Sequence, residues 1–254
     1  MNRKVLENSE LHRSLKELQI SSLNFTNRLI SGPSIILSNS NFSRGLRSIE
    51  FIDCEFKGSC FILESIDNSH LSLLFDKCSF ETSFKIDNCN FNRLRFFDIE
   101  KIGYSFNISG NSISTFYLKN SYKKNLARLI GNIQISGNTF EHKVDLQNLH
   151  HISESFVFTR NIIKTKERNG PNDELNTSFV NTRLHNADFS ETNFGQEVGF
   201  DKMTLEGNEG IHSFNDCTFG KAYFNGTNFG KYAFFNGSVF NGTVIFHGCQ
   251  NLEN

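Results

Sequence analysis

Cysteine, histidine and carboxylate side chains are the groups of this chain that could bind a metal or act on a substrate. Cys54, Cys78, Cys89 and Cys217 each stand two residues before a phenylalanine, and no cysteine belongs to a CxxC pair of the kind that binds zinc. A thiol at such a repeated position is expected to pack in the core as a compact apolar group. We therefore predict neither a metal site nor a redox role for these cysteines.

The histidines and acidic residues give no clearer catalytic pattern. The only local cluster of histidines consists of His142, His150 and His151. Without carboxylates at a defined spacing around them, we expect these three side chains on the surface. Asp87, Asp98 and Glu100 could line one face of a sheet, as carboxylates do in enzymes that cleave polysaccharides, but no spacing singles out a pair. The sequence therefore predicts no catalytic residue, no cofactor, no metal and no enzymatic activity.

The composition narrows the class of protein. The 254 residues include 28 Phe and 32 Asn but only 2 Pro and no Trp, and the formal net charge is −1. A general nucleic-acid binder would be distinctly basic. No apolar stretch is long enough for a transmembrane helix, and residues 1–20 lack the apolar segment of a secretion signal. We therefore expect a cytoplasmic protein that does not contact membranes and does not bind nucleic acid directly.

Phenylalanine recurs every five residues in the C-terminal third of the chain. The unbroken run consists of Phe214, Phe219, Phe224, Phe229 and Phe234. A small residue stands two positions before many of the large ones. Upstream, the small/large pairs are Thr177/Phe179, Thr182/Leu184, Ala187/Phe189 and Thr192/Phe194; after a slip of one residue near Tyr232, they are Ala233/Phe235, Ser238/Phe240 and Thr243/Ile245. Neither a helix, with period 3.6, nor a strand, with period 2, repeats every five residues.

A period of five indicates a chain that turns a corner in every quintet. The small and the large residue, two positions apart in an extended segment, point to the same side. We place both inside a coil and the intervening Asn, Asp, Gly, Lys and Ser residues at exposed sites and turns. Successive coils then stack about 4.8 Å apart through backbone hydrogen bonds. The sequence thus predicts a solenoid.

Two stretches carry a resemblance to a known family. Residues 187–196, Ala-Asp-Phe-Ser-Glu-Thr-Asn-Phe-Gly-Gln, and residues 217–231, which begin Cys-Thr-Phe-Gly-Lys, resemble the pentapeptide-repeat family. The family motif is a small residue, then Asn or Asp, then Leu or Phe, then two polar residues. The resemblance covers residues 176–250 well, and it implies a right-handed quadrilateral parallel β-helix with four quintets per coil. Members of the family do very different jobs.

Residues 20–165 keep the period of five only in pieces, for example at Phe51, Phe56 and Phe61. Irregular coils of the same helix with short insertions explain this most economically, and a separate β fold is the alternative. We therefore predict an all-β chain with a capping helix in 1–20, irregular coils in 21–165, a polar loop in 166–175 and regular coils in 176–254. The predicted core consists of Phe51, Phe56, Phe80, Phe91, Phe189, Phe194, Phe219, Phe224, Phe229, Phe235 and Phe240.

Both ends of a solenoid need covering, because exposed strand edges invite further pairing. At the N-terminus, Leu11, Leu15 and Leu18 have helical spacing, and Asn8 or Ser9 is available as N-cap. The quintets continue almost to the last residue of the sequence. We therefore expect the C-terminal end to form a homodimer across a two-fold axis, through Val244, Ile245 and Phe246. End-to-end dimers in the pentapeptide-repeat family support this expectation.

Polar interruptions at 122–129 and 164–176 are candidate interaction loops, and the first could form one or two helical turns. Their basic residues are Lys123, Lys124, Arg128, Lys166 and Arg168. Loops on a rigid framework often carry recognition. The sequence therefore predicts a non-enzymatic scaffold that binds a protein partner whose identity it does not reveal.

The distribution of charge along the chain suggests an alternative function. Residues 172–254 hold ten acids and four bases (net −6), which leaves 17 acids and 22 bases for residues 1–171 (net +5). Some pentapeptide-repeat proteins are acidic rods that mimic DNA, bind a type II topoisomerase such as gyrase, and protect or inhibit it. The resemblance therefore gives a DNA mimic as the second interpretation. A carbohydrate-binding or carbohydrate-cleaving β-helix is the third.

Overall fold

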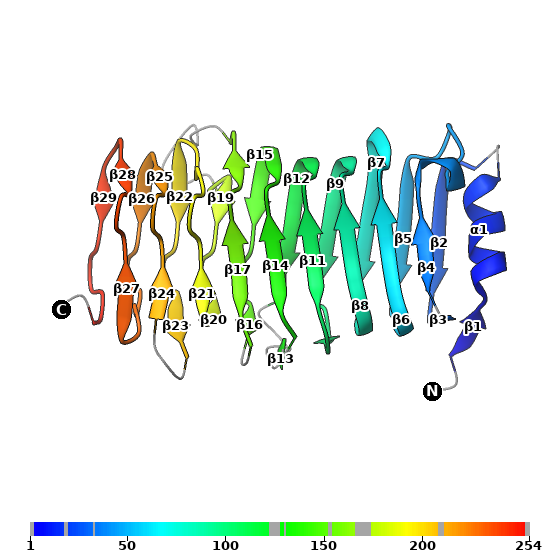
Figure 1. Ribbon diagram of the computed structural model, residues 1–254, viewed down its shortest axis with the longest axis horizontal. Coiled ribbons are helices and arrows are strands. Elements are labelled where there is room, and N and C mark those ends of the chain that lie inside the picture. Colours follow the sequence, from blue (N-terminus) through cyan, green and yellow to red (C-terminus); the bar gives the residue numbers. More distant parts are fainter. Residues whose placement is uncertain are drawn as a thin grey trace.

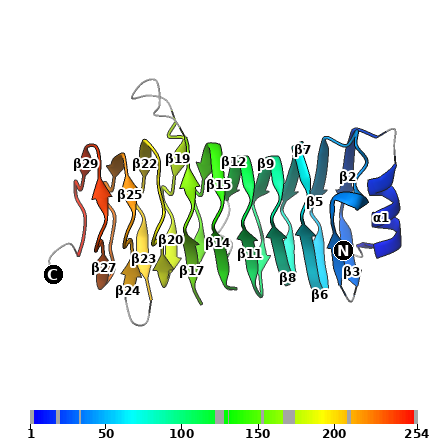
Figure 2. The same cartoon turned by 45° about the horizontal axis from the view of Figure 1, so that its top comes forward.

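The computed structural model describes residues 3–17, 20–32, 34–121, 128–129, 131–151, 154–165, 174–207 and 211–251. These residues form one elongated stack of coils, with a helix at the N-terminal end and the last coil at the other (Figures 1 and 2). All strand pairs are parallel, and each pair joins one coil to a neighbouring coil. The predicted all-β parallel solenoid is confirmed, while its right-handed winding stays a prediction.

Register pairs arrange the strands in four columns, which we call faces 1 to 4. Several long strands bend around a corner and belong to two faces. Face 1 contains β1 (Lys4–Leu6), β3 (Arg28–Gly32), the first halves of β6 (Glu55–Glu64) and β8 (Ser79–Asp87), β10 (Lys101–Ile102), β13 (Arg128–Leu129), β16 (His150–His151), β20 (Arg183–His185) and β23 (Thr204–Glu206). Face 2 contains β4 (Ile35–Leu37), the second halves of β6 and β8, β11 (Phe106–Ser109), β14 (Ile133–Ser136), β17 (Phe156–Thr159), β21 (Ala187–Asp188), β24 (Ile211–Ser213) and β27 (Tyr232–Phe234).

The other two faces complete each coil. Face 3 contains the first halves of β7 (Asp67–Asp76), β9 (Asn90–Phe97), β12 (Ser112–Lys119) and β15 (Thr139–Asp145), then β18 (Ile162–Ile163), β25 (Thr218–Phe219) and β28 (Val239–Phe240). Face 4 contains β2 (Ser22–Thr26), β5 (Ser48–Ile52), the second halves of β7, β9, β12 and β15, then β19 (Thr177–Ser178), β22 (Glu197–Gly199), β26 (Lys221–Tyr223) and β29 (Val244–Ile245). The same four faces therefore continue through both halves of the chain.

Extra residues at corners explain why the N-terminal half loses the period of five. The pairing of β6 with β8 shifts register between Lys57 and Cys60, and the pairing of β7 with β9 shifts between Asn68 and Ser72. On either side of each shift the strands remain aligned. The insertions therefore lengthen individual corners and leave the stack intact.

Phenylalanine rings fill the interior as columns that follow the faces. On face 4, Phe25, Phe51, Phe75 and Phe96 stack with centroids 5.2, 5.1 and 4.9 Å apart. In the regular coils, the columns are Phe189/Phe214/Phe235, Phe194/Phe219/Phe240 and Phe179/Phe200/Phe224/Phe246. Rings in adjacent columns meet edge to face, for example Phe80 and Phe84. Both arrangements are favourable for aromatic pairs.

A column of buried polar side chains runs beside the rings at the corner between faces 2 and 3. Asn111 Nδ2 donates to Asn138 Oδ1 (2.9 Å), and Asn138 Nδ2 donates to Asn161 Oδ1 (3.1 Å). The same oxygens accept the backbone N–H of the preceding coil, as Asn138 Oδ1 does from Asn111 N (3.0 Å). Thr192 and Cys217 occupy the equivalent place in later coils and donate to the carbonyl oxygens of Phe158 and Phe189. Our assignment of asparagine to exposed sites was therefore wrong for these three residues.

A residue with positive φ precedes each of these corner side chains. Examples are Gly110 and Gly137, both with φ of 65°, which stand before Asn111 and Asn138. Asp216, with φ of 55°, stands before Cys217. Glycine adopts this left-handed conformation at little cost, and it is the conformation that turns the chain from face 2 to face 3.

The N-terminal end is covered by α1 (Asn8–Lys16), which buries Leu11 and Leu15 against the first coil. The N-cap is Glu7, without a side-chain hydrogen bond, so the expected capping by Asn8 or Ser9 is wrong. Ser43 N donates to Leu15 O (2.9 Å), which ties the helix to the loop after the short 3₁₀ helix η1 (Asn39–Asn41). Leu18 lies outside the described residues.

The register of the last coil differs from our expectation by one residue. Phe246 stacks on Phe224 with centroids 4.9 Å apart, while Ile245 pairs with Tyr223 and is exposed. Val244 and Phe246, and not Thr243 and Ile245, therefore occupy the small and large positions. Phe240 and Phe246 are six positions apart, whereas their stacking partners Phe219 and Phe224 are five positions apart. The last coil therefore contains one additional residue at this corner.

Truncating a ring in the middle of the stack is expected to open a cavity that the neighbouring coils cannot close. Phe84 is buried, stacks on Phe61 and Phe106, and meets other rings edge to face. We predict that Phe84→Ala lowers the free energy of unfolding by about 3–5 kcal/mol. Phe97→Ala, at a half-buried outward position of β9, should cost roughly 1 kcal/mol. Urea unfolding measures both, and equal costs would contradict the inward assignment.

The asparagine column predicts a second difference in stability. Asn138→Ala removes the acceptor of Asn111 N and the side-chain donor to Ile108 O, both of which are buried. We expect a loss of about 2–4 kcal/mol, since each unsatisfied buried polar group costs about 1–3 kcal/mol. Asn92→Ala is the matched control, because its half-buried side chain makes no hydrogen bond with the described residues. A tolerated Asn138→Ala would show that the column does not stabilise the stack.

Candidate interaction surface

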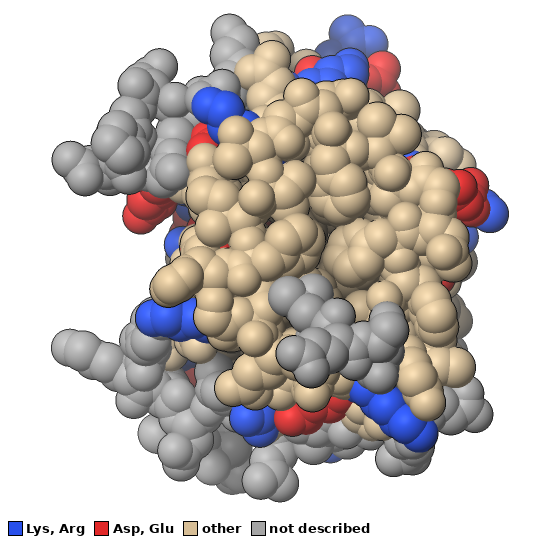
Figure 3. Space-filling model, turned by 90° about the vertical axis from the view of Figure 1, so that its left-hand side faces the viewer, with Lys and Arg blue, Asp and Glu red and all other residues tan. Residues whose placement is uncertain are grey.

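The C-terminal end of the solenoid is an apolar surface formed by β27, β28 and β29. The inward rings of Phe240 and Phe246, 37 and 39% exposed, lie on the end itself, and Tyr232, Phe234, Val239 and Ile245 are exposed at outward positions around the same last coil. Phe240 and Phe246 rest on Phe219 and Phe224 with one side of each ring, and among the described residues no further coil covers the other side. Figure 3 looks onto this end: its centre shows neither basic nor acidic side chains, and the charges lie at the rim. We call this surface the C-terminal end face.

The sequence prediction located only part of this end face. Ile245 and Phe246 are exposed, while Val244 is half-buried. Phe240, which we assigned to the core, is 37% exposed, and Phe235 is only partly buried, because both belong to the last coil. The other predicted core residues are buried. Tyr232, Phe234 and Val239 were missed, although two consecutive phenylalanines in an extended segment must point to opposite sides.

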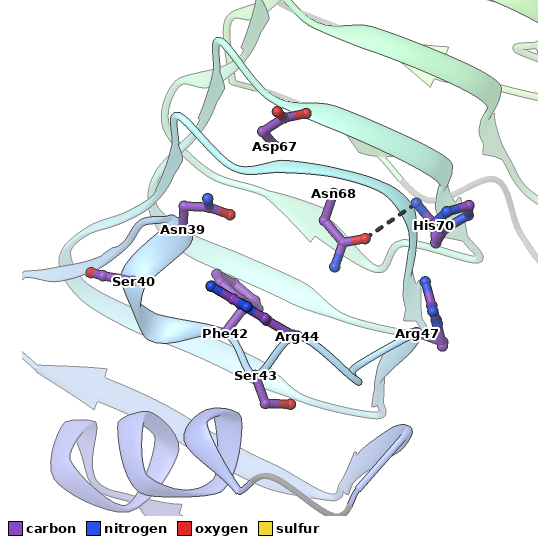
Figure 4. A pocket seen from close by; sticks show the side chains of 9 residues that line it. All are labelled: Asn39, Ser40, Phe42, Ser43, Arg44, Arg47, Asp67, Asn68 and His70. Carbon is purple, nitrogen blue, oxygen red and sulfur yellow. Dashed lines mark hydrogen bonds between the residues drawn. The ribbon is translucent and has the colours of Figure 1, made fainter.

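A hollow of about 860 Å³ lies near the N-terminal end (Figure 4). It forms because η1 and a turn replace the face 3 strand of one coil, while β7 bulges outward beside it. Asn68 joins the two segments by donating to Leu46 O (3.3 Å), and within β7 it accepts from His70 N (3.2 Å). Arg44 and Arg47 add positive charge, and Asp67 adds negative charge. The exposed lining of mixed charge suits polar contacts with a partner. No repeat in the sequence predicts this hollow.

Most of the predicted interaction loops cannot be placed. Lys123, Lys124, Lys166 and Arg168 lie outside the described residues. Arg128 belongs to β13, so the end of the first interruption is a strand and not a helical turn. At the border of the second, Lys164 Nζ lies 3.0 Å from Glu141 Oε1 and Lys143 Nζ lies 2.9 Å from Glu174 Oε2. The role of the loops stays a prediction.

The three acids that might have formed a carbohydrate site are engaged separately. Asp87 binds Lys85 (3.1 Å) and Ser109 (2.7 Å) on face 2, and although burial opposes ionisation, these two contacts hold its pKa below the ordinary value. Asp98 accepts from Ser121 N, and Glu100 accepts from Ser79 Oγ. Within the described part of the chain, no three His, Cys, Asp or Glu side chains are grouped so that they could hold a metal ion.

The histidine cluster of the sequence is divided in space. His142 Nδ1 lies 3.0 Å from Ser114 Oγ at the surface, whereas His151 belongs to face 1 and is completely buried. His151 Nε2 lies 2.9 Å from Gly131 O, and burial lowers the pKa of this ring. The expected surface position is therefore wrong for His151, because the sequence did not reveal the irregular coil to which it belongs.

The cysteine thiols are structural. All six cysteines fall within the described residues and are free. Cys54, Cys78, Cys89 and Cys217 are buried, and burial raises the pKa of Cys89 to about 11 and that of Cys217 to about 12. A thiol is a nucleophile or metal ligand as its thiolate, so Cys89 and Cys217 are inert near neutral pH.

Comparison with known proteins agrees with the repeat seen in the coils. The family model described as pentapeptide repeats (9 copies) matches residues 209–250. The match identifies residues 209–250 as pentapeptide repeats, and the coils before them continue the same parallel solenoid. No significant match was found among curated proteins or among solved structures. Of the helices that the structure describes, none is long and apolar enough to cross a membrane.

A buried histidine makes stability depend on pH. His212 is completely buried, its Nδ1 accepts from Ala187 N (3.2 Å), and burial, assisted by His185, lowers its pKa to about 4. The unfolded chain protonates this ring near pH 6.5. The stability that the neutral ring contributes is therefore complete above pH 6.5 and falls as the pH drops towards 4.

We predict that the wild-type chain loses about 2 kcal/mol between pH 7 and pH 5 that the variant His212→Gln does not lose. Glutamine can still accept the hydrogen bond from Ala187 N. Urea unfolding of both chains at the two pH values gives the difference, in which the titration of the other groups cancels. An identical loss in both chains would show that His212 is protonated in the folded state.

Proposed function

We propose that this protein is a non-enzymatic, rigid scaffold for protein–protein interaction, and that its C-terminal end face binds a second copy of the chain. The observation that carries the proposal is the cluster of exposed aromatic and aliphatic residues on that end face. Large exposed apolar patches are uncommon on monomeric soluble proteins and mark sites of interaction. The stacked rings behind the patch hold it in one shape, which limits the entropy lost on binding.

A second copy is the occupant that fits the end face best. An interface of two-fold symmetry needs a self-complementary patch, and the charged side chains of this face lie at its rim, so two copies meet without opposing like charges at the centre. The outward edges of β27, β28 and β29 offer backbone groups to the partner coil. The sides and loops of the joined rod remain available for another protein, whose identity stays open.

Ion pairs argue against the alternative of an acidic DNA mimic. Glu191 pairs with Arg160 (3.0 Å) and Glu206 with Arg183 (3.3 Å), so part of the negative charge of the C-terminal coils is balanced locally. A partner recognised by a phosphate-like field would bind with strong salt dependence. An apolar end-to-end contact should instead respond little to salt, which separates the two interpretations experimentally.

Substituting one ring of the end face is expected to weaken the dimer. In sedimentation equilibrium at micromolar concentration, we predict a mass of twice the 29.0 kDa chain, little changed between low and high salt. Phe240→Glu places a charge in the apolar centre and should weaken self-association at least about tenfold. Tyr104→Glu, at an exposed aromatic residue on the side of the rod, is the matched control.

A strict monomer at micromolar concentration would contradict the proposed dimer. Equal weakening by Phe240→Glu and Tyr104→Glu would place the contact elsewhere. Thermal unfolding of Tyr104→Glu should resemble that of the wild-type monomer, because this side chain is exposed. Phe240→Glu also loses the contact with Phe219, so its self-association is compared at a temperature at which thermal unfolding shows it to be folded.

A further inference from the structure

Face 4 carries a second hollow, far from the C-terminal end face and formed by the neighbouring strands β9 and β12. Three register pairs line it: Arg93 with Thr115, Arg95 with Tyr117, and Phe97 with Lys119. Its volume is about 350 Å³, at the lower limit for sites of small organic ligands. We call it the face 4 hollow.

The two arginines of the hollow are uncompensated. Neither guanidinium has an acidic partner within 4 Å among the residues that the structure describes. Arg95 Nε is buried and makes no hydrogen bond with the described residues, and an unsatisfied buried donor costs free energy. In the pairing of β7, β9 and β12, Arg95 stands between Leu74 and Tyr117, so neither residue in register with it offers a carboxylate.

The lysines of this surface are held differently. Lys119 Nζ lies 3.0 Å from the buried Asp145 Oδ2, and Lys143 Nζ lies 2.9 Å from Glu174 Oε2. Both also rest over the ring of Tyr117, at 5.2 and 5.8 Å from its centroid. The free positive charge of the hollow is therefore concentrated on Arg93 and Arg95.

The spacing of the two arginines favours a tetrahedral oxyanion. Residues two apart on one strand project to the same side, about 7 Å apart at their backbones. A carboxylate is satisfied by one bidentate arginine, whereas a phosphate has enough terminal oxygens to accept from two guanidinium groups at once. The rings of Phe97 and Tyr117, whose centroids are 5.6 Å apart, form an apolar wall beside them. We propose that the face 4 hollow binds a phosphomonoester, with Arg93 and Arg95 as its anion ligands.

The site is too small and too isolated for a nucleic-acid strand. A groove that follows a phosphate backbone needs free positive charges along its length. On the coil before the hollow the outward positions are Ser72, Leu74 and Asp76. On the coil after it, Lys143 and Asp145 are already paired. The surroundings therefore favour one compact anion over a polymer.

Isothermal titration calorimetry on the full chain tests the site, with phenyl phosphate as the probe. We expect saturable binding with a dissociation constant on the order of 1 mM or below. Arg93→Gln and Arg95→Gln should each weaken binding at least about tenfold, since a hydrogen bond to a charged group is lost. Arg183→Gln, at an exposed arginine of face 1, should leave it unchanged. Inorganic phosphate and benzoate should both bind less tightly, because one lacks the ring and the other the tetrahedral anion.

Two further titrations distinguish the source of the ligand. A phosphotyrosine peptide that binds more tightly than phenyl phosphate would support a phosphorylated partner protein, and equal affinities would support a free phosphorylated metabolite. Oligothymidylate whose affinity exceeds that of phenyl phosphate and rises with length would overturn the proposal in favour of single-stranded nucleic acid. The absence of saturable binding of phenyl phosphate would also overturn the proposal. So would an unchanged affinity of Arg95→Gln, when thermal unfolding shows that this variant is folded. If the face 4 hollow does not bind phenyl phosphate, the proposed dimer through the C-terminal end face is unaffected, because the two sites share no residue.

Discussion

The fold depends on the agreement between two distances: the spacing of parallel strands and the thickness of stacked aromatic rings. Strands in a sheet lie about 4.8 Å apart. The stacked phenylalanines have nearly the same centroid separation, for example 4.9 Å for Phe200 on Phe224. Each coil can therefore satisfy its backbone hydrogen bonds and bring its rings into contact at the same time. This is why one flat side chain per quintet recurs along the chain.

The corner positions complete this arrangement with polar contacts. Where the coil turns, a short side chain points inward and donates to a carbonyl oxygen of the preceding coil; Thr192, Cys217 and Asn161 do so with three different chemical groups. The position requires a short donor and accepts several residue types. The same requirement explains why Cys54, Cys78, Cys89 and Cys217 recur at buried positions of the core.

The sequence predicted the structure best in the coils that repeat every five residues without an insertion. There the position of Phe219 or Phe224 follows directly from the period, and the fold could be predicted from a few such coils. It was least informative where corners contain extra residues, because an insertion moves the next inward position without a local signal. The buried His151 and the shift from Ile245 to Phe246 are examples. The face 4 hollow needed strand register, since Arg95 and Tyr117 are far apart in sequence and adjacent only through pairing.

We propose that two rods join end to end through the C-terminal end face. Small-angle X-ray scattering over a series of concentrations tests this geometry directly. End-to-end joining predicts that the maximum dimension rises to about twice that of the monomer as the dimer forms, while the cross-sectional radius of gyration stays constant. A constant maximum dimension, or a cross-section that grows with concentration, would contradict it, because the chains would then remain single or associate side by side.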